Sequence, residues 1–232
     1  MRRFMLLMAT MGATVLLVSG VAYALSVTCD GTGDQDPDTG ECRGTIFDDL
    51  ITGTAQRDVI FALNGFDEVY AGDGNDELNG GLLGDSLYGQ NGNDTYFGGR
   101  GADQLVEPGI YTGDDQMNAG PGPDYLAGGP GADTLRGEDG DDAYPGDITS
   151  TAMYGEVGND KLFGGNGDDS MEGDEGSDEL YGGPNDDYLD ADTYESANTP
   201  DVVNAGLGYD VCVVNENDAV YNCERIQEEP NP

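Results

Sequence analysis

The chain has 232 residues, with 47 acidic and 8 basic side chains, 39 glycines and no histidine or tryptophan, and its formal net charge is −39. A charge this negative repels phosphate backbones and anionic lipid surfaces, so we expect no nucleic-acid partner. The absence of histidine excludes Ser-His-Asp and Cys-His catalytic sites and the usual zinc sites. Composition alone would permit disorder, but the spacing of the acidic residues argues against it.

The first 24 residues have the pattern of a secretory signal peptide. Arg2 and Arg3 precede an apolar run over residues 4–18, and small residues at positions 22 and 24 supply a cleavage site before Leu25. One alternative is a membrane anchor, for which the run is short. The other is a lipoprotein signal, for which the residues 26–28 before Cys29 are the wrong sequence. We therefore predict that residues 1–24 are removed, that no membrane span remains, and that the protein is secreted, either extracellular or at the cell surface.

Four cysteines form two pairs that are close in sequence, Cys29 with Cys42 and Cys212 with Cys223. Secretion implies an oxidising compartment, in which such cysteines form disulfides. Three connectivities are formally possible, and the local one is favoured because each pair flanks one end of the repeat region described next. We expect an N-terminal disulfide cap over residues 25–43 and a C-terminal cap with an acidic tail over residues 214–232.

The region 44–213 repeats every nine residues, and the repeated position, here called the slot, is aspartate in seventeen of eighteen units. Thr151 is the exception. The register slips by three residues after Asp103 and by five after Asp187, so we expect insertions near residues 106–111 and 192–199. The slots are Asp49, Asp58, Asp67, Asp76, Asp85, Asp94, Asp103, Asp115, Asp124, Asp133, Asp142, Thr151, Asp160, Asp169, Asp178, Asp187, Asp201 and Asp210.

The neighbours of the slots repeat as well. Glycine occurs two residues before the slot in twelve of the eighteen units. An uncharged, mostly apolar residue stands two residues after every slot. These residues are Ile51, Ile60, Val69, Leu78, Leu87, Tyr96, Leu105, Met117, Leu126, Leu135, Tyr144, Met153, Leu162, Met171, Leu180, Leu189, Val203 and Cys212.

One apolar residue in nine is too sparse for an amphipathic helix. It suits a three-residue strand whose middle side chain points inward, because strand side chains alternate between the two faces. The remaining glycine-rich residues would reverse the chain. Two units then make one coil, and stacked coils form two parallel sheets around a thin core. The fold class predicted is all-β, a parallel β-roll.

Stacking of coils would place the slot aspartates in rows, spaced by about 4.8 Å. Bare carboxylates at this distance repel one another, so we expect cations between the turns. Oxygen ligands in flexible glycine loops suit a hard cation, and calcium better than magnesium because its coordination shell is larger and more variable.

Four segments resemble the hemolysin-type RTX nonapeptide GGxGxDxUx. They are Gly80-Gly81-Leu82-Leu83-Gly84-Asp85, Gly98-Gly99-Arg100-Gly101-Ala102-Asp103-Gln104-Leu105-Val106, Gly128-Gly129-Pro130-Gly131-Ala132-Asp133-Thr134-Leu135-Arg136 and Gly164-Gly165-Asn166-Gly167-Asp168-Asp169. Leu83 replaces the third glycine in the first of them. The resemblance implies a parallel β-roll in which each calcium ion lies between a turn and the one two units on, held by two aspartates and by carbonyl groups of the turns.

Carried over residue by residue, the resemblance implies on the order of ten calcium ions. Phe47 and Gln56 replace glycine in the first two units, which predicts a filled cap without metal. Thr151 has no carboxylate, so no calcium is expected between its turn and those of Asp133 and Asp169. The implied ligands are Asp67, Asp76, Asp85, Asp94, Asp103, Asp115, Asp124, Asp133, Asp142, Asp160, Asp169, Asp178, Asp187 and Asp210, with Asp49, Asp58 and Asp201 as further candidates.

Aromatic residues recur one position after the core residue. Tyr70 with Tyr88, and Phe163 with Tyr181, are eighteen residues apart and should be neighbours on an outer sheet face. Lateral packing would explain them; a strip that binds sugar or a partner is the alternative.

The sequence predicts calcium binding rather than catalysis. The repeat accounts for the acidic clusters, and residues 25–43 and 214–232 are too few for a catalytic domain. Two alternatives stay open. One is a calcium-dependent adhesin or cell-surface structural protein that binds polysaccharide or associates with itself, and the other is an accessory module of a secreted enzyme.

Overall fold

The computed structural model describes residues 25–29, 41–144, 147–191 and 199–228. The predicted signal peptide, and residues 192–198 of the second predicted insertion, lie outside these ranges. Within them every regular element is a strand. The described residues accordingly contain no helix of the length and hydrophobicity needed to cross a membrane.

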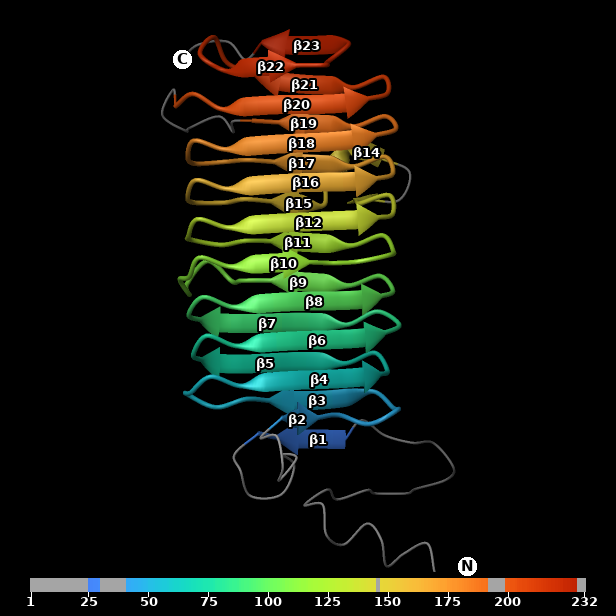
Figure 1. Cartoon of the computed structure of the whole chain (residues 1–232), viewed down its shortest axis with the longest axis vertical. Coiled ribbons are helices and arrows are strands. Elements are labelled where there is room, and N and C mark those ends of the chain that lie inside the picture. The colour runs from blue at the N-terminus through green and yellow to red at the C-terminus, as the bar shows by residue number, and fades with distance from the viewer. Residues whose placement is uncertain (1–24, 30–40, 145–146, 192–198, 229–232) are drawn as a thin grey trace, which may run out of the picture.

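Two large parallel sheets face each other along the length of the molecule (Figure 1). The first has eleven strands: β1 (Leu25–Thr28), β3 (Asp49–Thr52), β5 (Glu68–Asp73), β7 (Ser86–Asn91), β9 (Gln104–Val106), β11 (Tyr125–Ala127), β15 (Met153–Tyr154), β17 (Ser170–Glu172), β19 (Tyr188–Asp190), β21 (Val211–Val214) and β23 (Arg225–Glu228). The second has ten: β2 (Cys42–Arg43), β4 (Val59–Asn64), β6 (Glu77–Leu82), β8 (Thr95–Arg100), β10 (Gln116–Asn118), β12 (Thr134–Asp139), β16 (Lys161–Asn166), β18 (Glu179–Pro184), β20 (Val202–Leu207) and β22 (Ala219–Tyr221).

Successive nonapeptides alternate between the two sheets. Val69 pairs with Leu87 in one sheet, and Ile60 pairs with Leu78 in the other, so residues eighteen apart are lateral neighbours. Two units therefore make one coil, and the predicted parallel β-roll is confirmed.

The thin core is built from the residues two positions after each slot, such as Ile51, Leu87 and Leu162, which are fully buried. The prediction of three-residue strands was wrong for much of the roll, where strands are six residues long and have two inward positions. The second inward residue, four after the slot, is usually alanine or glycine, as in Ala62 and Gly89. A Cβ atom on Gly89 would lie 2.2 Å from Oδ2 of Asp94, so only a very small residue leaves room for the next slot carboxylate.

The assignment of Thr151 as a slot was also wrong. The segment after Asp142 leaves the roll as an antiparallel hairpin, β13 (Ala143–Tyr144) with β14 (Asp147–Thr151). The coil then resumes, and Met153 pairs with Leu126, the position predicted for Tyr144. Because this insertion is nine residues long, it leaves the phase of the repeat unchanged.

The sheets extend beyond residues 44–213 at both ends. β1 and β2 pair in parallel with β3 and β4, and β22 and β23 continue the sheets past β20 and β21. Both disulfides form with the predicted local pairing, Cys29–Cys42 at the first coil and Cys212–Cys223 at the last. Each one fastens an end of the stack.

Gly92 shows how tightly the turns stack. Its φ is +126°, and a Cβ atom would lie 1.3 Å from the carbonyl oxygen of Gly74 in the preceding coil. We expect Gly92→Ala to lower the free energy of unfolding by about 3 kcal/mol, because both backbone strain and overlap must be relieved. In the matched control Gly109→Ala, the nearest atom is Oε2 of Glu156 at 3.4 Å, and we expect a change within about 0.5 kcal/mol. Urea unfolding followed by circular dichroism measures both, and equal losses would contradict the prediction.

Candidate metal centre

The slot aspartates form two rows along the roll, one beside each large sheet. They stand just before the strands, and each is buried, with at most 5% of its surface exposed. The first row contains Asp49, Asp67, Asp85, Asp103, Asp124, Asp142, Asp169, Asp187 and Asp210, and the second contains Asp58, Asp76, Asp94, Asp115, Asp133, Asp160, Asp178 and Asp201.

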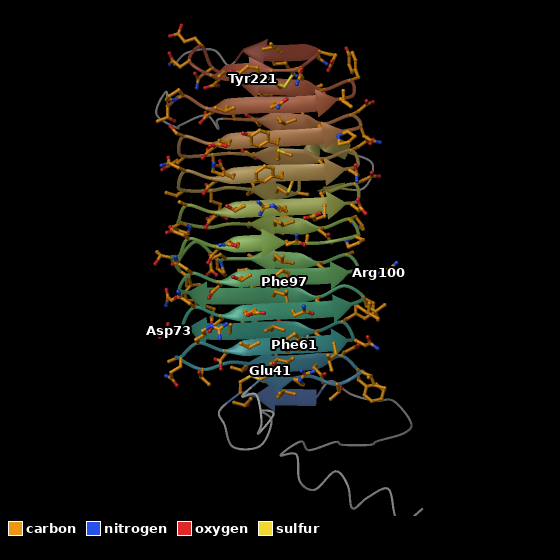
Figure 2. All side chains as sticks on the ribbon, viewed as in Figure 1. Glu41, Phe61, Asp73, Phe97, Arg100 and Tyr221 are labelled. Atoms are coloured by element: carbon orange, nitrogen blue, oxygen red, sulfur yellow. A yellow bond between two sulfur atoms is a disulfide. The ribbon has the colours of Figure 1, made fainter. Side chains whose placement is uncertain are left out.

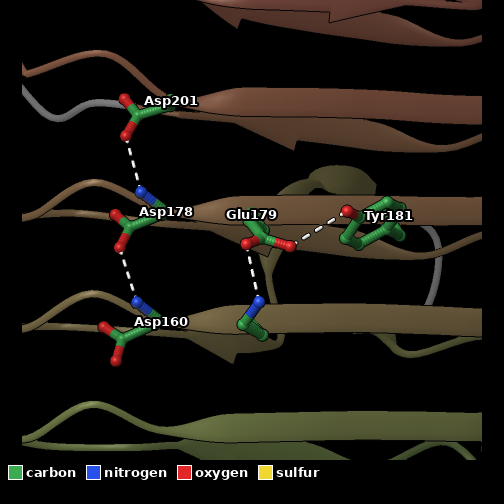
Figure 3. Close-up of polar contacts among 6 residues, drawn as sticks. Asp160, Asp178, Glu179, Tyr181 and Asp201 are labelled. Carbon is green, nitrogen blue, oxygen red and sulfur yellow. Dashed lines mark hydrogen bonds and ion pairs between the residues drawn. The ribbon is translucent and has the colours of Figure 1, made fainter.

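A hydrogen bond joins each aspartate to the next one in its row. The backbone N–H of one slot donates to Oδ1 of the slot in the following coil, as Asp160 does to Asp178 at 2.8 Å and Asp178 to Asp201 at 2.7 Å (Figure 3). The bonds are 2.7–3.0 Å long throughout both rows. One oxygen of each carboxylate is therefore held in place by the backbone.

The rows bring together the pairs that the resemblance implied, including Asp76 with Asp94 and Asp115 with Asp133. They also join two pairs that the sequence missed because of the hairpin. Asp133 is followed by Asp160, and Asp142 by Asp169, each 27 residues later. No row is interrupted at Thr151, which contradicts the gap expected there.

The second carboxylate oxygen has no hydrogen-bond donor at most slots. Among the described residues, the buried Oδ2 atoms without a partner are those of Asp67, Asp76, Asp85, Asp94, Asp103, Asp115, Asp124, Asp133, Asp142, Asp160, Asp169, Asp187 and Asp210. Burying a carboxylate oxygen without a partner costs free energy. Each of these Oδ2 atoms therefore needs a cation or a hydrogen-bond donor.

Burial has a large effect on the acidity of these groups. It raises the pKa of Asp76 to about 6 and that of Asp133 to about 8, from an ordinary value of 3.8. The N–H of the preceding slot lowers the pKa, and neighbouring carboxylates raise it further, as Asp160 and Asp115 do at Asp133. Without a cation, these carboxyl groups retain protons at a pH where exposed aspartate has lost them.

At the N-terminal end, groups of the protein itself donate hydrogen bonds to the Oδ2 atoms that have no partner at most other slots. Oδ2 of Asp49 accepts hydrogen bonds from the backbone and hydroxyl of Thr45, and Oδ2 of Asp58 accepts the same pair from Thr54. This geometry agrees with the filled cap predicted for the first two units.

At the C-terminal end, Asp218 and Glu224 extend the rows beyond the predicted slots. They accept from the N–H groups of Asp201 and Asp210, and Oδ2 of Asp218 also accepts from the N–H of Asn215. These two residues are spaced irregularly, so the period of nine did not reveal them.

A second ladder, also missed by sequence reasoning, runs through the residue just before the slot. At this position an Asp or Asn side chain accepts the N–H of the equivalent residue in a later coil, as Asn75 does from Asn93 at 3.2 Å and Asp168 from Asp186 at 3.0 Å. The recurring doublets Asp-Asp and Asn-Asp in the sequence were its signal.

Glu107 is a third feature that the repeat pattern did not reveal. It occupies the inward position that glycine or alanine takes in most other units and is fully buried. Its Oε2 accepts hydrogen bonds from the hydroxyl of Tyr96 and from the N–H of Gln90, both at 2.8 Å. Burial raises the pKa of Glu107 to about 8; the bonds from Tyr96 and Gln90 lower it, and the charges of Asp115 and Asp94 raise it.

The raised pKa of Glu107 gives a pH-dependent prediction. A carboxyl whose pKa is higher in the folded state favours folding in its neutral form, and this contribution is lost as pH rises through about 8. In saturating calcium, burial still favours the neutral form of Glu107, so we expect the melting temperature of Glu107→Gln to rise relative to that of the original protein as pH increases, by roughly 3 °C. Glu175→Gln, at an exposed position, is the matched control for replacing a carboxylate by an amide. A constant difference at every pH would contradict the prediction.

The residues present fit calcium. The rows supply only oxygen donors, namely the unpartnered carboxylate oxygens and the backbone carbonyls of the glycine turns, and these are the ligands that calcium prefers. Among the described residues, no three His, Cys, Asp or Glu side chains converge on one point. Carboxylates from successive coils would therefore have to share an ion with backbone carbonyl groups.

The chain is a parallel β-roll built from repeats, and its turns carry buried carboxylates. This arrangement defines a class of solenoid proteins whose turns offer oxygen ligands to hard cations. Five stretches of the chain match the RTX calcium-binding nonapeptide repeat (4 copies): residues 43–78, 52–85, 70–105, 111–144 and 154–189. They cover more than half of the chain, which therefore belongs to the RTX calcium-binding nonapeptide repeat family. The comparison with curated proteins found no match.

Proposed function

We propose that this is a secreted, extracellular calcium-binding protein whose β-roll folds around stacked Ca²⁺ ions. The observation that carries the proposal is the pair of rows in which buried Oδ2 atoms lack a partner among the described residues. Calcium would satisfy these atoms and cancel the repulsion within each row. Because the ions bind the native state and not the unfolded chain, metal binding contributes directly to folding stability.

The slots differ in their suitability as ligands. The internal slots with an unpartnered Oδ2, such as Asp94 and Asp133, are the proposed calcium ligands. Asp49 and Asp58 are the weakest of the predicted ligands, because Thr45 and Thr54 already satisfy one oxygen of each. About ten ions would occupy the rows.

Extracellular calcium would set the state of the chain. At millimolar concentrations, typical of extracellular modules, the ions would hold a rigid roll, and at low calcium the acidic chain would unfold. The two disulfides support an oxidising compartment. We propose a binding and structural role rather than catalysis, since the acidic clusters lie in the rows.

Circular dichroism with and without calcium tests this function. We expect little β signal in excess chelator at pH 8 and a strong β signal after calcium is added. A strong β signal in chelator that calcium leaves unchanged would contradict it.

The structure gives the polysaccharide-binding alternative little support. Tyr70 and Tyr88 stack face to face with ring centroids 4.8 Å apart, as Phe163 and Tyr181 do at 5.0 Å. The guanidinium of Arg136 lies over the Phe163 ring at 4.9 Å. Each of these rings therefore has at least one face against another side chain, and Phe163 has both, which agrees with lateral packing.

A further inference from the structure

Five large apolar side chains are exposed together on one edge of the roll, over the turns that connect the two sheets near the N-terminal end. We call them the apolar edge patch. They are Ile46, Phe47, Phe66, Leu82 and Leu83, and between 46% and 66% of each is exposed.

These side chains form one continuous surface because their turns stack on one another. Asn64 pairs with Leu82, and Leu82 with Arg100, in adjacent strands. The N–H of Phe66 donates to Oδ1 of Asp48 at 3.0 Å, which joins the first two turns. A shallow hollow of about 350 Å³ lies between the turns. Ile46, Phe47, Leu82 and Leu83 line it together with Asp48, Asn64 and Gly65 of the same turns.

Leu83 is held in a strained conformation in the last turn of the patch, next to the turn of Arg100. Its φ is +77°, in the left-handed region that favours glycine. A leucine here costs roughly 1 kcal/mol in backbone energy and leaves half of its surface in water. Leu63 has a similar φ of +88° but is partly buried, whereas Leu83 combines the backbone cost with exposure of an apolar side chain, a combination that burial against a partner would offset.

The patch is electrically neutral in a chain whose net charge is −39. Apart from the buried slot aspartates, the charged residues in its stacked turns are Asp48 at one end and Arg100 at the other, both exposed. Arg100 makes no ion pair with any described residue, and Figure 2 shows it at the edge of the roll. Farther along, the turns of this edge carry Asp139, Asp141, Asp168 and Asp186.

We propose that the apolar edge patch is the contact surface between two copies of this chain, which associate side by side with their long axes antiparallel. A two-fold axis through the patch would place Asp48 of each copy opposite Arg100 of the other, giving two ion pairs around an apolar centre. Asp48 and Arg100 lie three coils apart, roughly 14 Å. If two copies met instead through the later turns of this edge, aspartates of one copy would face aspartates of the other, and the like charges would repel.

Sedimentation equilibrium of the calcium-loaded chain tests this interface. We expect a monomer–dimer equilibrium at concentrations up to about 100 µM. Leu83→Gly restores the residue that the turn prefers, so the roll stays folded, and we expect it to weaken dimerisation roughly tenfold. Asp48→Arg and Arg100→Asp should each weaken it by a similar factor, and the double variant should restore it.

The exposed pair Leu207 and Tyr209, at the C-terminal end of the same edge, provides the control. Leu207→Gln with Tyr209→Ser removes more exposed apolar surface than Leu83→Gly does and should leave dimerisation unchanged. Circular dichroism of each variant in calcium confirms folding. A monomer at every concentration would overturn the proposal, as would a dimer insensitive to Leu83→Gly or a double charge swap without rescue.

Discussion

In calcium-free buffer, the chain is expected to hold more β structure at pH 4.5 than at pH 8. The carboxyls of the rows have an ordinary pKa of 3.8, and burial raises it to about 6 in Asp103, about 7 in Asp142 and about 8 in Asp124. Each such group stabilises the fold in its protonated form. Its contribution is fully present below pH 3.8 and is lost as pH rises through 6 to 8.

Calcium should reverse this dependence, because protons and the cation compete for the same oxygens. In millimolar calcium, stability should rise as the pH increases from 5 to 8. Far-UV circular dichroism during a pH titration measures the β structure with and without calcium. The calcium-free series uses buffer treated with a chelating resin, because soluble chelators bind calcium less tightly in acid. A calcium-free chain that gains β structure as pH rises would contradict the prediction.

A change at one internal slot should act in opposite directions with and without calcium. Oδ1 of Asp133 accepts the N–H of Asp115, and Oδ2 has no partner among the described residues. Asp133→Asn keeps the first oxygen and removes an acid that, without calcium, must be buried either as a charge or after taking up a proton. We expect it to stabilise the calcium-free roll by about 1 kcal/mol and to raise the calcium concentration needed for folding at least roughly tenfold.

The matched control is the slot at the end of the second row. Oδ2 of Asp58 is already satisfied by Thr54, so Asp58→Asn should leave the calcium requirement within about twofold of the original. Calcium titrations followed by circular dichroism compare the two variants. Equal effects at Asp58 and Asp133 would show that the unpartnered oxygens are not the ligands.

Much of the fold could be predicted from the sequence because the period of nine determines which side chains point inward. The residues two after the slots, such as Ile60 and Leu180, are fully buried as predicted. The two parallel sheets and the coil of eighteen residues followed from the same spacing. The local disulfides followed from the position of each cysteine pair at one end of the repeat region. The stacking of Tyr70 on Tyr88 was predicted in the same way.

Other features could not be predicted, for definite physical reasons. The hairpin β13–β14 adds one full period, so phase alone makes Thr151 look like a substituted slot. The burial of the slot carboxylates depends on small residues four positions after each slot, such as Gly89, whose missing side chain leaves room for Asp94. Glu107 breaks the glycine or alanine preference at that position, and only the fold shows that Tyr96 reaches it across the core.

Calcium titration by isothermal calorimetry tests the central claim most directly, because it counts the ions bound per chain. Two rows of buried slot carboxylates predict on the order of ten calcium ions per chain, bound as the roll folds. A count of one or two would contradict the stacked rows of metal sites.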